Sequence, residues 1–181
     1  MASYTVDIAH SAAEFSVKHM MVTTVKGVFN DLSGTMIFDA DNPANSSIEA
    51  AIQVASINTR MEDRDNHLRS ADFFDVENFA TMTFKSTSVE MTGDDTAKVT
   101  GDLTIRDVTK PVVFEVEYFG TLENSPFGDT RAGFQGTTTI NREDFGLTWN
   151  QALETGGFMV SKEVKITVDL QAVKQAEEAP S

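Results

Sequence analysis

The clearest structural signal in this sequence is the run Val160-Ser161-Lys162-Glu163-Val164-Lys165-Ile166-Thr167-Val168-Asp169-Leu170. Apolar side chains at 164, 166, 168 and 170 alternate with charged or hydroxyl side chains at 163, 165, 167 and 169. Successive side chains of a β-strand point to opposite faces, so a period of two predicts a strand with one apolar face and one solvated face.

Further strands are predicted on both sides of this run. Residues 98–106 and 48–54 repeat the alternation, with a small or apolar residue at every second position. Four more segments have the β-branched and aromatic content of strands, namely 25–38, 81–91, 112–119 and 131–142. Within 81–91 the apolar positions change parity between Phe84 and Val89, which predicts a β-bulge or a strong twist. Short segments rich in Asp, Asn, Gly and Pro separate the runs, so neighbouring strands are expected to be antiparallel.

Seven or eight long strands in one chain would leave exposed sheet edges, and closure into a barrel removes them. We therefore predict an all-β fold, an elongated eight-stranded antiparallel barrel of the lipocalin-like type. A two-sheet sandwich is the alternative, because alternation alone does not separate the two. A single domain is expected over residues 1–170, since 181 residues suit one closed β architecture. Residues 171–181 have no apolar period and are expected to form a disordered acidic tail.

One short helix is predicted within residues 56–74, where the period of two is lost. Thr59-Arg60-Met61-Glu62 fits a capping box. In this motif the Thr59 side chain accepts a hydrogen bond from the backbone N–H of Glu62, and the Glu62 side chain accepts one from the backbone N–H of Thr59. Asp65 and Arg69 have the spacing of an i,i+4 ion pair on the outer side of this helix. We expect the helix to cover part of the barrel as a lid or plug.

The composition excludes several classes of function. The 181 residues include 28 acidic and 14 basic side chains, a formal net charge of −14, and no cysteine. Disulfide scaffolds, thiolate metal sites and cysteine nucleophiles are thus ruled out, and nucleic acid or an anionic membrane is an unfavourable partner. The sequence as written has no signal peptide and no apolar run long enough to cross a membrane. It is therefore expected to be cytoplasmic, although a processed periplasmic or secreted protein would look the same.

Catalytic signatures are missing from the sequence. It contains no Gly-x-Ser-x-Gly elbow, no phosphate-binding glycine loop and no His-Glu-x-x-His motif. Asp63 and His67 would align on one helix face, but two ligands do not complete a metal site, so no metal is expected. The alternative with an enzymatic function uses His67 with Asp65 or Asp72 as a general acid/base pair in a hydrolase or isomerase-type reaction.

Several ordered motifs carry a resemblance to a known family. They include Asp7-Ile8-Ala9-His10-Ser11, Phe15-Ser16-Val17-Lys18-His19, Arg64-Asp65-Asn66-His67-Leu68-Arg69-Ser70-Ala71-Asp72-Phe73-Phe74-Asp75 and Asn141-Arg142-Glu143-Asp144-Phe145-Gly146-Leu147. Over about residues 4 to 170 the chain resembles the YceI family of polyisoprenoid-binding, lipocalin-like proteins. The order and spacing of these motifs along the chain make the resemblance specific.

The resemblance implies a barrel whose apolar interior holds the tail of an isoprenoid lipid, such as a polyprenyl phosphate or an isoprenoid quinone. The implied function is sequestration or carriage of this lipid, with no catalytic residue and no cofactor besides the bound lipid. A solid-cored β domain that acts through protein partners is a further alternative, and a homodimer is compatible with the sequence. The candidate residues at the mouth of the barrel are His19, Arg64, His67 and Arg69. The candidate residues of its wall are Phe15, Val17, Phe29, Leu68, Phe73, Phe74 and Phe145.

Overall fold

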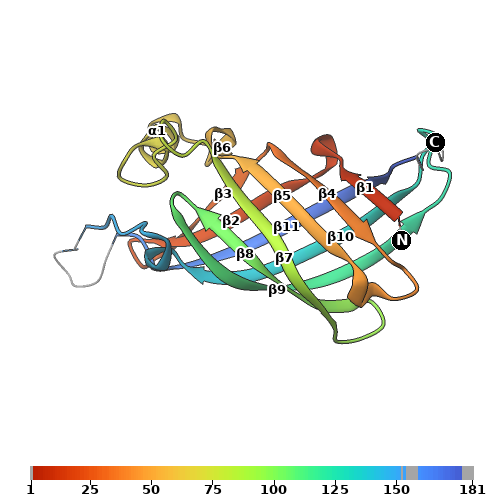
Figure 1. Ribbon diagram of the computed structural model, residues 1–181. Coiled ribbons are helices and arrows are strands. Elements are labelled where there is room, and N and C mark those ends of the chain that lie inside the picture. Colours follow the sequence, from red (N-terminus) through yellow and green to blue (C-terminus); the bar gives the residue numbers. More distant parts are fainter. Residues whose placement is uncertain (1, 152, 154–158, 177–181) are drawn as a thin grey trace.

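The computed structural model describes residues 2–151, 153 and 159–176. The strands form an elongated barrel, with helix α1 (Glu62–Arg69) at one end and strand β1 (Ala2–Val6) towards the other (Figure 1). We call these two ends the α1 end and the β1 end. The turn between β2 (Ala12–His19) and β3 (Thr23–Phe29) lies at the α1 end.

The remaining elements complete the barrel and its connections. The other strands are β4 (Leu32–Phe38), β5 (Ser47–Gln53), β6 (Ile57–Asn58), β7 (Thr81–Met91), β8 (Thr96–Ile105), β9 (Val108–Leu122), β10 (Arg131–Asn141) and β11 (Glu163–Lys174). Four 3-10 turns lie between strands, namely η1 (Ile8–His10), η2 (Pro43–Asn45), η3 (Val54–Ser56) and η4 (Arg142–Phe145).

The strand order confirms the predicted closed barrel. All pairings are antiparallel, in the order β1-β4-β5-β7-β8-β9-β10-β11-β2-β3-β6, and β1 also pairs with β11. Three long strands are interrupted, so that β1 continues into β2, β3 into β4 and β5 into β6. With these pairs joined, the described residues form a closed eight-stranded up-and-down barrel. Closure occurs where β11 pairs with β1 near Ala172 and with β2 near Ile166.

Three predicted strand boundaries were wrong. Residues 25–38 are two strands, because the chain breaks at Asn30 and Asp31 between β3 and β4. Strand β9 extends beyond the predicted 112–119 at both ends. Strand β11 continues to Lys174, since β1 offers a partner there and Tyr4 pairs with Lys174. The predicted tail therefore begins later than residue 171, and its last part, 177–181, lies outside the described residues. Long-range pairing, which local alternation does not encode, set these limits.

The predicted bulge in β7 is confirmed. The register with β8 shifts between Ser86 and Ser88, at the place where the apolar parity changes. One extra residue at this point turns the following side chains to the other face of the strand. As a result, Phe84 before the bulge and Val89 after it both face the barrel interior.

The helix is present, but the predicted capping box is wrong. Helix α1 follows Met61, and no side chain caps its start. Thr59 instead donates its backbone N–H and its hydroxyl to Oδ1 of Asp65, at 2.8 and 2.5 Å. Asp65 is buried, so it points inward rather than to solvent. A buried carboxylate needs donors, and the two groups of Thr59 supply them.

The predicted ion pair between Asp65 and Arg69 is also wrong. The Arg69 guanidinium donates to the carbonyl oxygens of Ala55 and Ile57, at 3.2 and 3.0 Å. Through these bonds, Arg69 ties the helix to the segment that precedes it. The i,i+4 spacing allowed an ion pair, but Asp65 bonds to Thr59 and Arg69 bonds to the two carbonyls instead.

Candidate functional site

A long cavity of about 850 Å³ runs through the barrel, and we call it the bore. Its wall is mainly apolar and includes residues of β2, β3, β4, β5, β7, β8, β9, β10 and β11. The bore reaches exposed residues at both ends, Met61 and Asp63 at the α1 end and Asp94 and Asp95 at the β1 end. The buried residues form two clusters, so the core surrounds the bore instead of filling the barrel.

The apolar strand faces that were predicted from the sequence form part of the bore wall. Val164, Ile166, Val168 and Leu170 of β11 are all on its wall. The alternating small and apolar residues of β5 and β8 are there as well, namely Ile48, Ala50, Ile52, Ala97, Val99, Leu103 and Ile105. The period of two thus identified the inner face of these strands correctly.

Two aromatic rings lie against glycines of neighbouring strands, which keeps them on the wall. A Cβ atom on Gly27 would stand 2.3 Å from Cζ of Phe15, so the ring occupies the place of a side chain. The ring of Phe84 covers Gly101 in the same way, at 2.4 Å. Glycine leaves room for a ring to cover the backbone. The rings of Phe15 and Phe84 therefore extend along the wall and leave the centre of the bore open.

An aromatic cluster lies at the α1 end of the bore. The ring centroid of His67 is 4.8 Å from that of Trp149 and 5.1 Å from that of Phe73, both in edge-on contacts. The Nε2 atom of His67 also forms a 2.9 Å hydrogen bond with Oδ2 of Asp72. The His67 side chain is 39% exposed and lines the bore, so it borders both solvent and the apolar interior. We call the opening at this cluster the mouth of the bore.

Arg64 is fixed beside the mouth by Thr59. Its Nε donates to the hydroxyl of Thr59 at 2.8 Å, and its Nη2 donates to the carbonyl of the same residue at 2.6 Å. Thr59 is 2% exposed and is in turn held by Asp65. This network places a cation on the bore wall at the α1 end.

Arg142 is a second cation at this end, and it is 3% exposed. It donates to four backbone carbonyls, those of Ser161 (2.9 Å), Leu147 (2.6 Å), Trp149 (2.9 Å) and Val160 (3.3 Å). Burial lowers the pKa of the Arg142 guanidinium, and the nearby Glu143 raises it. The four bonds hold Trp149 and the segment before β11 in place.

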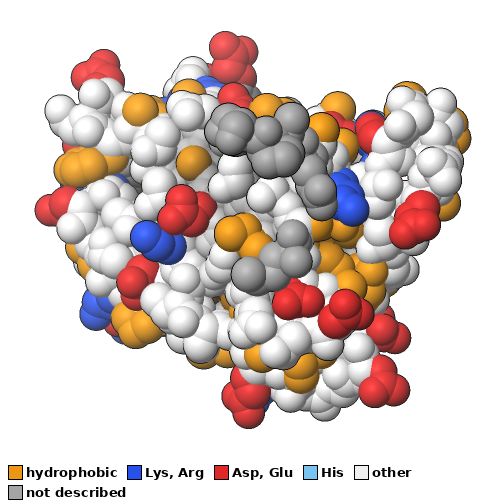
Figure 2. All heavy atoms as spheres, turned by 45° about the vertical axis from the view of Figure 1, so that its right-hand side comes forward, with side chains coloured by type: hydrophobic (Ala, Val, Ile, Leu, Met, Phe, Trp, Pro, Cys, Tyr) orange, Lys and Arg blue, Asp and Glu red, His pale blue; other side chains and the backbone are white. Residues whose placement is uncertain are grey.

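The β1 end has a different wall. The rings of Phe38, Tyr118 and Phe134 line the bore there, with centroids 5.2 to 5.4 Å apart. The carboxylates of Asp94 and Asp95 lie at the same end. On the face that brings this side of the barrel forward, Asp and Glu side chains outnumber Lys and Arg (Figure 2).

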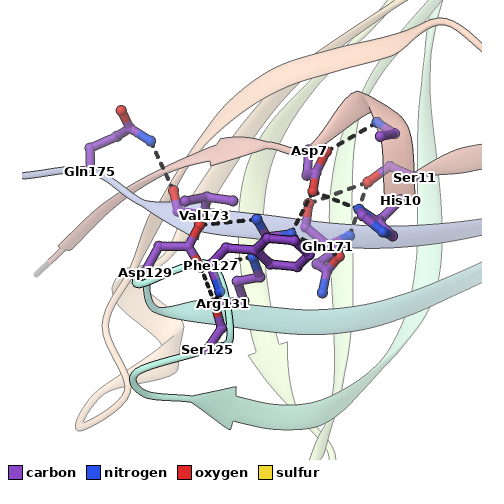
Figure 3. A network of polar contacts seen from close by, with 11 residues as sticks. Asp7, His10, Ser11, Ser125, Phe127, Asp129, Arg131, Gln171, Val173 and Gln175 are labelled. Carbon is purple, nitrogen blue, oxygen red and sulfur yellow. Dashed lines mark hydrogen bonds and ion pairs between the residues drawn. The ribbon is translucent and has the colours of Figure 1, made fainter.

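A polar network also pins the β1 end from outside the bore (Figure 3). The Arg131 guanidinium binds Asp129 through both carboxylate oxygens, at 2.8 and 3.0 Å, and binds Asp7 at 2.7 Å. His10 contacts Asp7 at 2.8 Å, and the Arg131 guanidinium lies 4.6 Å from the ring centre of Phe127. The network joins the break between β1 and β2 to β10 and to the loop before it.

Nine of the eleven predicted site residues lie on the wall of the bore. They are Phe15, Val17, His19, Phe29, Arg64, His67, Leu68, Phe73 and Phe74. The other two, Arg69 and Phe145, are not on the wall. Arg69 is turned away from the bore toward Ala55 and Ile57. Phe145 is 2% exposed and packs in the core beside Leu147, where η4 turns it off the bore wall.

Sequence reasoning missed other wall residues at the α1 end, notably Trp149, Met159 and Arg142. As the only tryptophan of the chain, Trp149 was a usable signal. Arg142 lay inside a quoted motif, but its carbonyl partners depend on the fold.

Residues 2–151, 153 and 159–176 contain no group of three or more His, Asp or Glu that could hold a metal ion. Within the same residues, no helix is long and apolar enough to cross a membrane.

Comparison with known proteins places the chain in a family. Residues 4–172 match the sequence pattern of the YceI-like domain. The chain belongs to the YceI family. Curated relatives of this YceI-family protein include UPF0312 protein SAS2572 and UPF0312 protein SA2479 of Staphylococcus aureus (strains MSSA476 and N315). Each is 44% identical over 165 residues, which cover 91% of this chain and 94% of the relative.

Solved structures of YceI-like barrels share the architecture. BcnA of Burkholderia cenocepacia is 26% identical with a TM-score of 0.80, over 92% of this chain and 98% of BcnA. The YceI protein of Campylobacter jejuni is 30% identical with a TM-score of 0.75, over 88% and 90% of the two chains. A polyisoprenoid binding domain from Saccharophagus degradans is 16% identical with a TM-score of 0.71, over 97% and 100%, and shares the fold with this YceI-family chain.

Proposed function

We propose that this YceI-family protein binds a long-chain isoprenoid lipid in the bore and sequesters or carries it. The candidate ligands are a polyprenyl phosphate and an isoprenoid quinone. The observation that carries the proposal is the continuous apolar bore, with polar residues gathered at its ends. The polyisoprenoid binding domain from Saccharophagus degradans, which has the same fold, supports the choice of ligand class.

The dimensions of the bore suit a long, thin ligand. Its 850 Å³ lies near the upper end of the range of about 300 to 1,000 Å³ that is usual for ligand pockets. Strand β9 has 15 residues. At a rise of about 3.3 Å per residue and a tilt of about 40°, such a strand extends about 38 Å along the barrel axis. A compact ligand would leave much of this length empty.

The energetics favour long tails over short ones. Removing ten CH₂-sized groups from water contributes about 8 kcal/mol, at about 0.8 kcal/mol for each group. Association itself costs an estimated 4 to 15 kcal/mol. A tail of ten carbons is therefore close to break-even, and affinity should rise with tail length until the bore is filled.

The charges on the wall indicate how the ligand is oriented. At the α1 end the wall carries the cations Arg64 and Arg142 against the single carboxylate of Asp63, whereas Asp94 and Asp95 lie at the β1 end. A phosphate head group is attracted by the two arginines and repelled by the two carboxylates. We therefore place the head group at the mouth, near His67, and the end of the tail among the rings of the β1 end.

The alternative with an enzymatic function has one observation in its favour, the hydrogen bond between His67 and Asp72. However, no hydrogen bond in the described part of the chain joins the imidazole ring of His67 to a hydroxyl group, and the sequence has no cysteine. A pair of this kind activates a nucleophile or a bound substrate only when a third group is positioned beside it. We propose a binding protein without catalytic residues or a cofactor other than its lipid.

The direct test is extraction of the purified protein with organic solvent, followed by mass spectrometry. We expect an isoprenoid lipid in stoichiometric amount. A ligand that is chemically converted by the protein, with conversion lost in His67→Ala, would favour the enzyme. A bore that is empty after purification and takes up no isoprenoid from solution would end the proposal.

A pair of adjacent substitutions tests whether the bore is the binding site. Ala50 lies on the wall of the bore, and Ala51, the next residue of β5, points to the other face. Ala50→Phe fills part of the bore and should weaken binding of a long-chain quinone by tenfold or more. Ala51→Phe adds the same ring outside and should leave affinity within about twofold. Equal affinities for the two variants, with intact circular dichroism, would contradict binding in the bore.

A further inference from the structure

The tip of the β2–β3 hairpin exposes three apolar residues beside the mouth. Met20, Met21 and Val22 are 43%, 67% and 78% exposed. The N–H of Met20 donates to the carbonyl of Met159 at 2.7 Å, and Met159 lines the bore. Met61, which also lines the bore, is 55% exposed. These four exposed apolar residues at the α1 end, Met20, Met21, Val22 and Met61, are called the apolar rim.

The geometry of the turn gives no local reason for methionine. His19 pairs with Thr23, and the N–H of Val22 donates to the carbonyl of His19 at 3.2 Å. Met20 and Met21 both have positive φ, 50° and 63°. The turn from His19 to Val22 therefore has positive φ at both central positions, as in a type I′ turn, and such positions strongly prefer Asn and Gly. Two long side chains are unfavourable in this turn, so their presence points to a role outside the fold.

The charge around the tip differs from that of the whole chain. Residues 18–26 contain two lysines and no carboxylate, although the chain has 28 acidic and 14 basic residues. Lys18 donates from its Nζ to the hydroxyl of Thr24 at 2.7 Å, so it lies along the hairpin just behind the tip. Lysine stems can lie along an apolar boundary with the ammonium group in water. Contact of the tip with an apolar phase therefore requires no carboxylate of this segment to lose its water.

We propose that the apolar rim inserts into the surface of an uncharged lipid bilayer and holds the mouth of the bore against it. Apolar side chains at the bilayer surface leave water, and methionine adapts its shape to irregular surroundings. The contact should be weak and reversible, because only four side chains take part. A water-insoluble ligand could then pass between bilayer and bore without entering bulk water. This goes beyond the proposed function, since docking requires no ligand in the bore.

Flotation of the full-length protein with phosphatidylcholine vesicles tests the proposal. The decisive variant combines Met20→Asn with Met21→Gly, the residue pair that a type I′ turn prefers. The hairpin should therefore fold at least as well, with a melting temperature unchanged or raised by a few degrees. The partition coefficient onto vesicles should fall by about tenfold, because two exposed methionines no longer leave water. As a matched control, Leu122→Asn removes a 57% exposed leucine at the β1 end and should change the partition coefficient little.

Several outcomes would overturn the proposal. One is a wild-type protein that does not float, and another is a double variant that floats as well as the wild type. An equal loss in Leu122→Asn would mean that apolar exposure anywhere on the barrel is sufficient. Tighter binding to phosphatidylglycerol vesicles would assign the contact to the lysines. A wild-type dimer in sedimentation velocity that the double variant abolishes would make the rim an interface between two copies of this chain.

Uptake of a long-chain quinone delivered from cyclodextrin separates this proposal from the proposed function. The double variant should take up the quinone as the wild type does, because Met20 and Met21 are not on the wall of the bore. Normal uptake with lost flotation supports docking, while normal flotation with no uptake in either protein contradicts only the lipid-binding function.

Discussion

Arg131 at the β1 end and Arg142 at the α1 end hold their surroundings by different means. The Arg131 side chain is 13% exposed and has two carboxylate partners, Asp7 and Asp129. Arg142 is 3% exposed, and its hydrogen bonds all go to backbone carbonyls. The positive charge of Arg131 is therefore neutralised by hydrogen-bonded carboxylates, whereas Arg142 is hydrogen-bonded only to peptide carbonyls and has Glu143 nearby.

This difference separates a structural clamp from a region prepared for a ligand. The ion pairs at the β1 end fix the place where β1 and β2 meet and leave no positive charge for a guest. At the α1 end, backbone carbonyls hold Arg142 without a carboxylate hydrogen bond, which is compatible with the proposed binding of an anionic head group there. The two ends should accordingly respond differently to mutation, to pH and to the addition of ligand.

The largest effect is expected for Arg142→Met. Methionine keeps an apolar stem but leaves four carbonyls at the α1 end without their donor. Unsatisfied buried groups cost about 1 to 3 kcal/mol each, so the free energy of unfolding should fall by about 3 to 5 kcal/mol after partial relaxation. Urea denaturation followed by circular dichroism measures this loss. Arg142→Lys keeps the charge but donates fewer hydrogen bonds, so its free energy of unfolding should lie between those of the wild type and Arg142→Met. An unchanged urea midpoint for Arg142→Met would contradict the assigned role.

Arg131→Met should have a smaller effect. The substitution leaves Asp7 and Asp129 without their cation and removes the contact with Phe127, but solvent reaches this network and screens the charges. We expect the melting temperature to fall by less than in Arg142→Met, and quinone affinity to stay the same. A loss of quinone affinity in a folded Arg131→Met protein would mean that the β1 end also controls ligand binding.

Acid should weaken the β1 end in a defined pH window. The hydrogen bond with His10 lowers the pKa of Asp7, and the hydrogen bonds from Arg131 lower the pKa of Asp129 to about 2. A carboxyl group with a lowered folded pKa stabilises the fold above its unfolded pKa of about 4 and loses this contribution as pH falls toward the folded value. The melting temperature should therefore decline between about pH 4 and pH 2. Asp129→Asn should show a shallower decline, and an identical slope would disprove the contribution of this carboxylate.

The smallest effect is expected for His67→Gln. Glutamine can still bond Asp72, but it removes the ring that lies 4.8 Å from Trp149, so the tryptophan emission should change. Quinone affinity should change by less than about threefold, because burial of the tail contributes most of the binding energy. Fluorescence titration reports both quantities. A larger loss of affinity would mean that contacts at the mouth, and not burial of the tail along the wall, contribute most of the binding energy.

The inner faces of the strands could be predicted from the sequence because alternation is a local property. Val164 and Ile166 face the bore as predicted, and the parity change in β7 located its bulge. The family motif drew attention to His67 and Phe74, and the structure places both on the wall of the bore.

Contacts that depend on the fold could not be predicted in this way. Thr59 has the pattern of a helix cap, but its hydroxyl instead satisfies the buried carboxylate of Asp65. Arg69 and Phe145 stand in the right motifs and still point away from the bore, because backbone carbonyls and the turn of η4 determine their direction. The extension of β11 to Lys174 required β1 as a partner from the far end of the chain.

The rings of Phe15 and Phe84, which cover Gly27 and Gly101, have a consequence for how such barrels diversify. Barrel diameter normally follows from strand number, which changes only by large insertions. Here the free width can be adjusted by single substitutions at a glycine or at the ring that covers it, with every strand left in register. Substitutions at those four positions are therefore expected to change the width open to a ligand, and a designer could alter ligand preference through them alone.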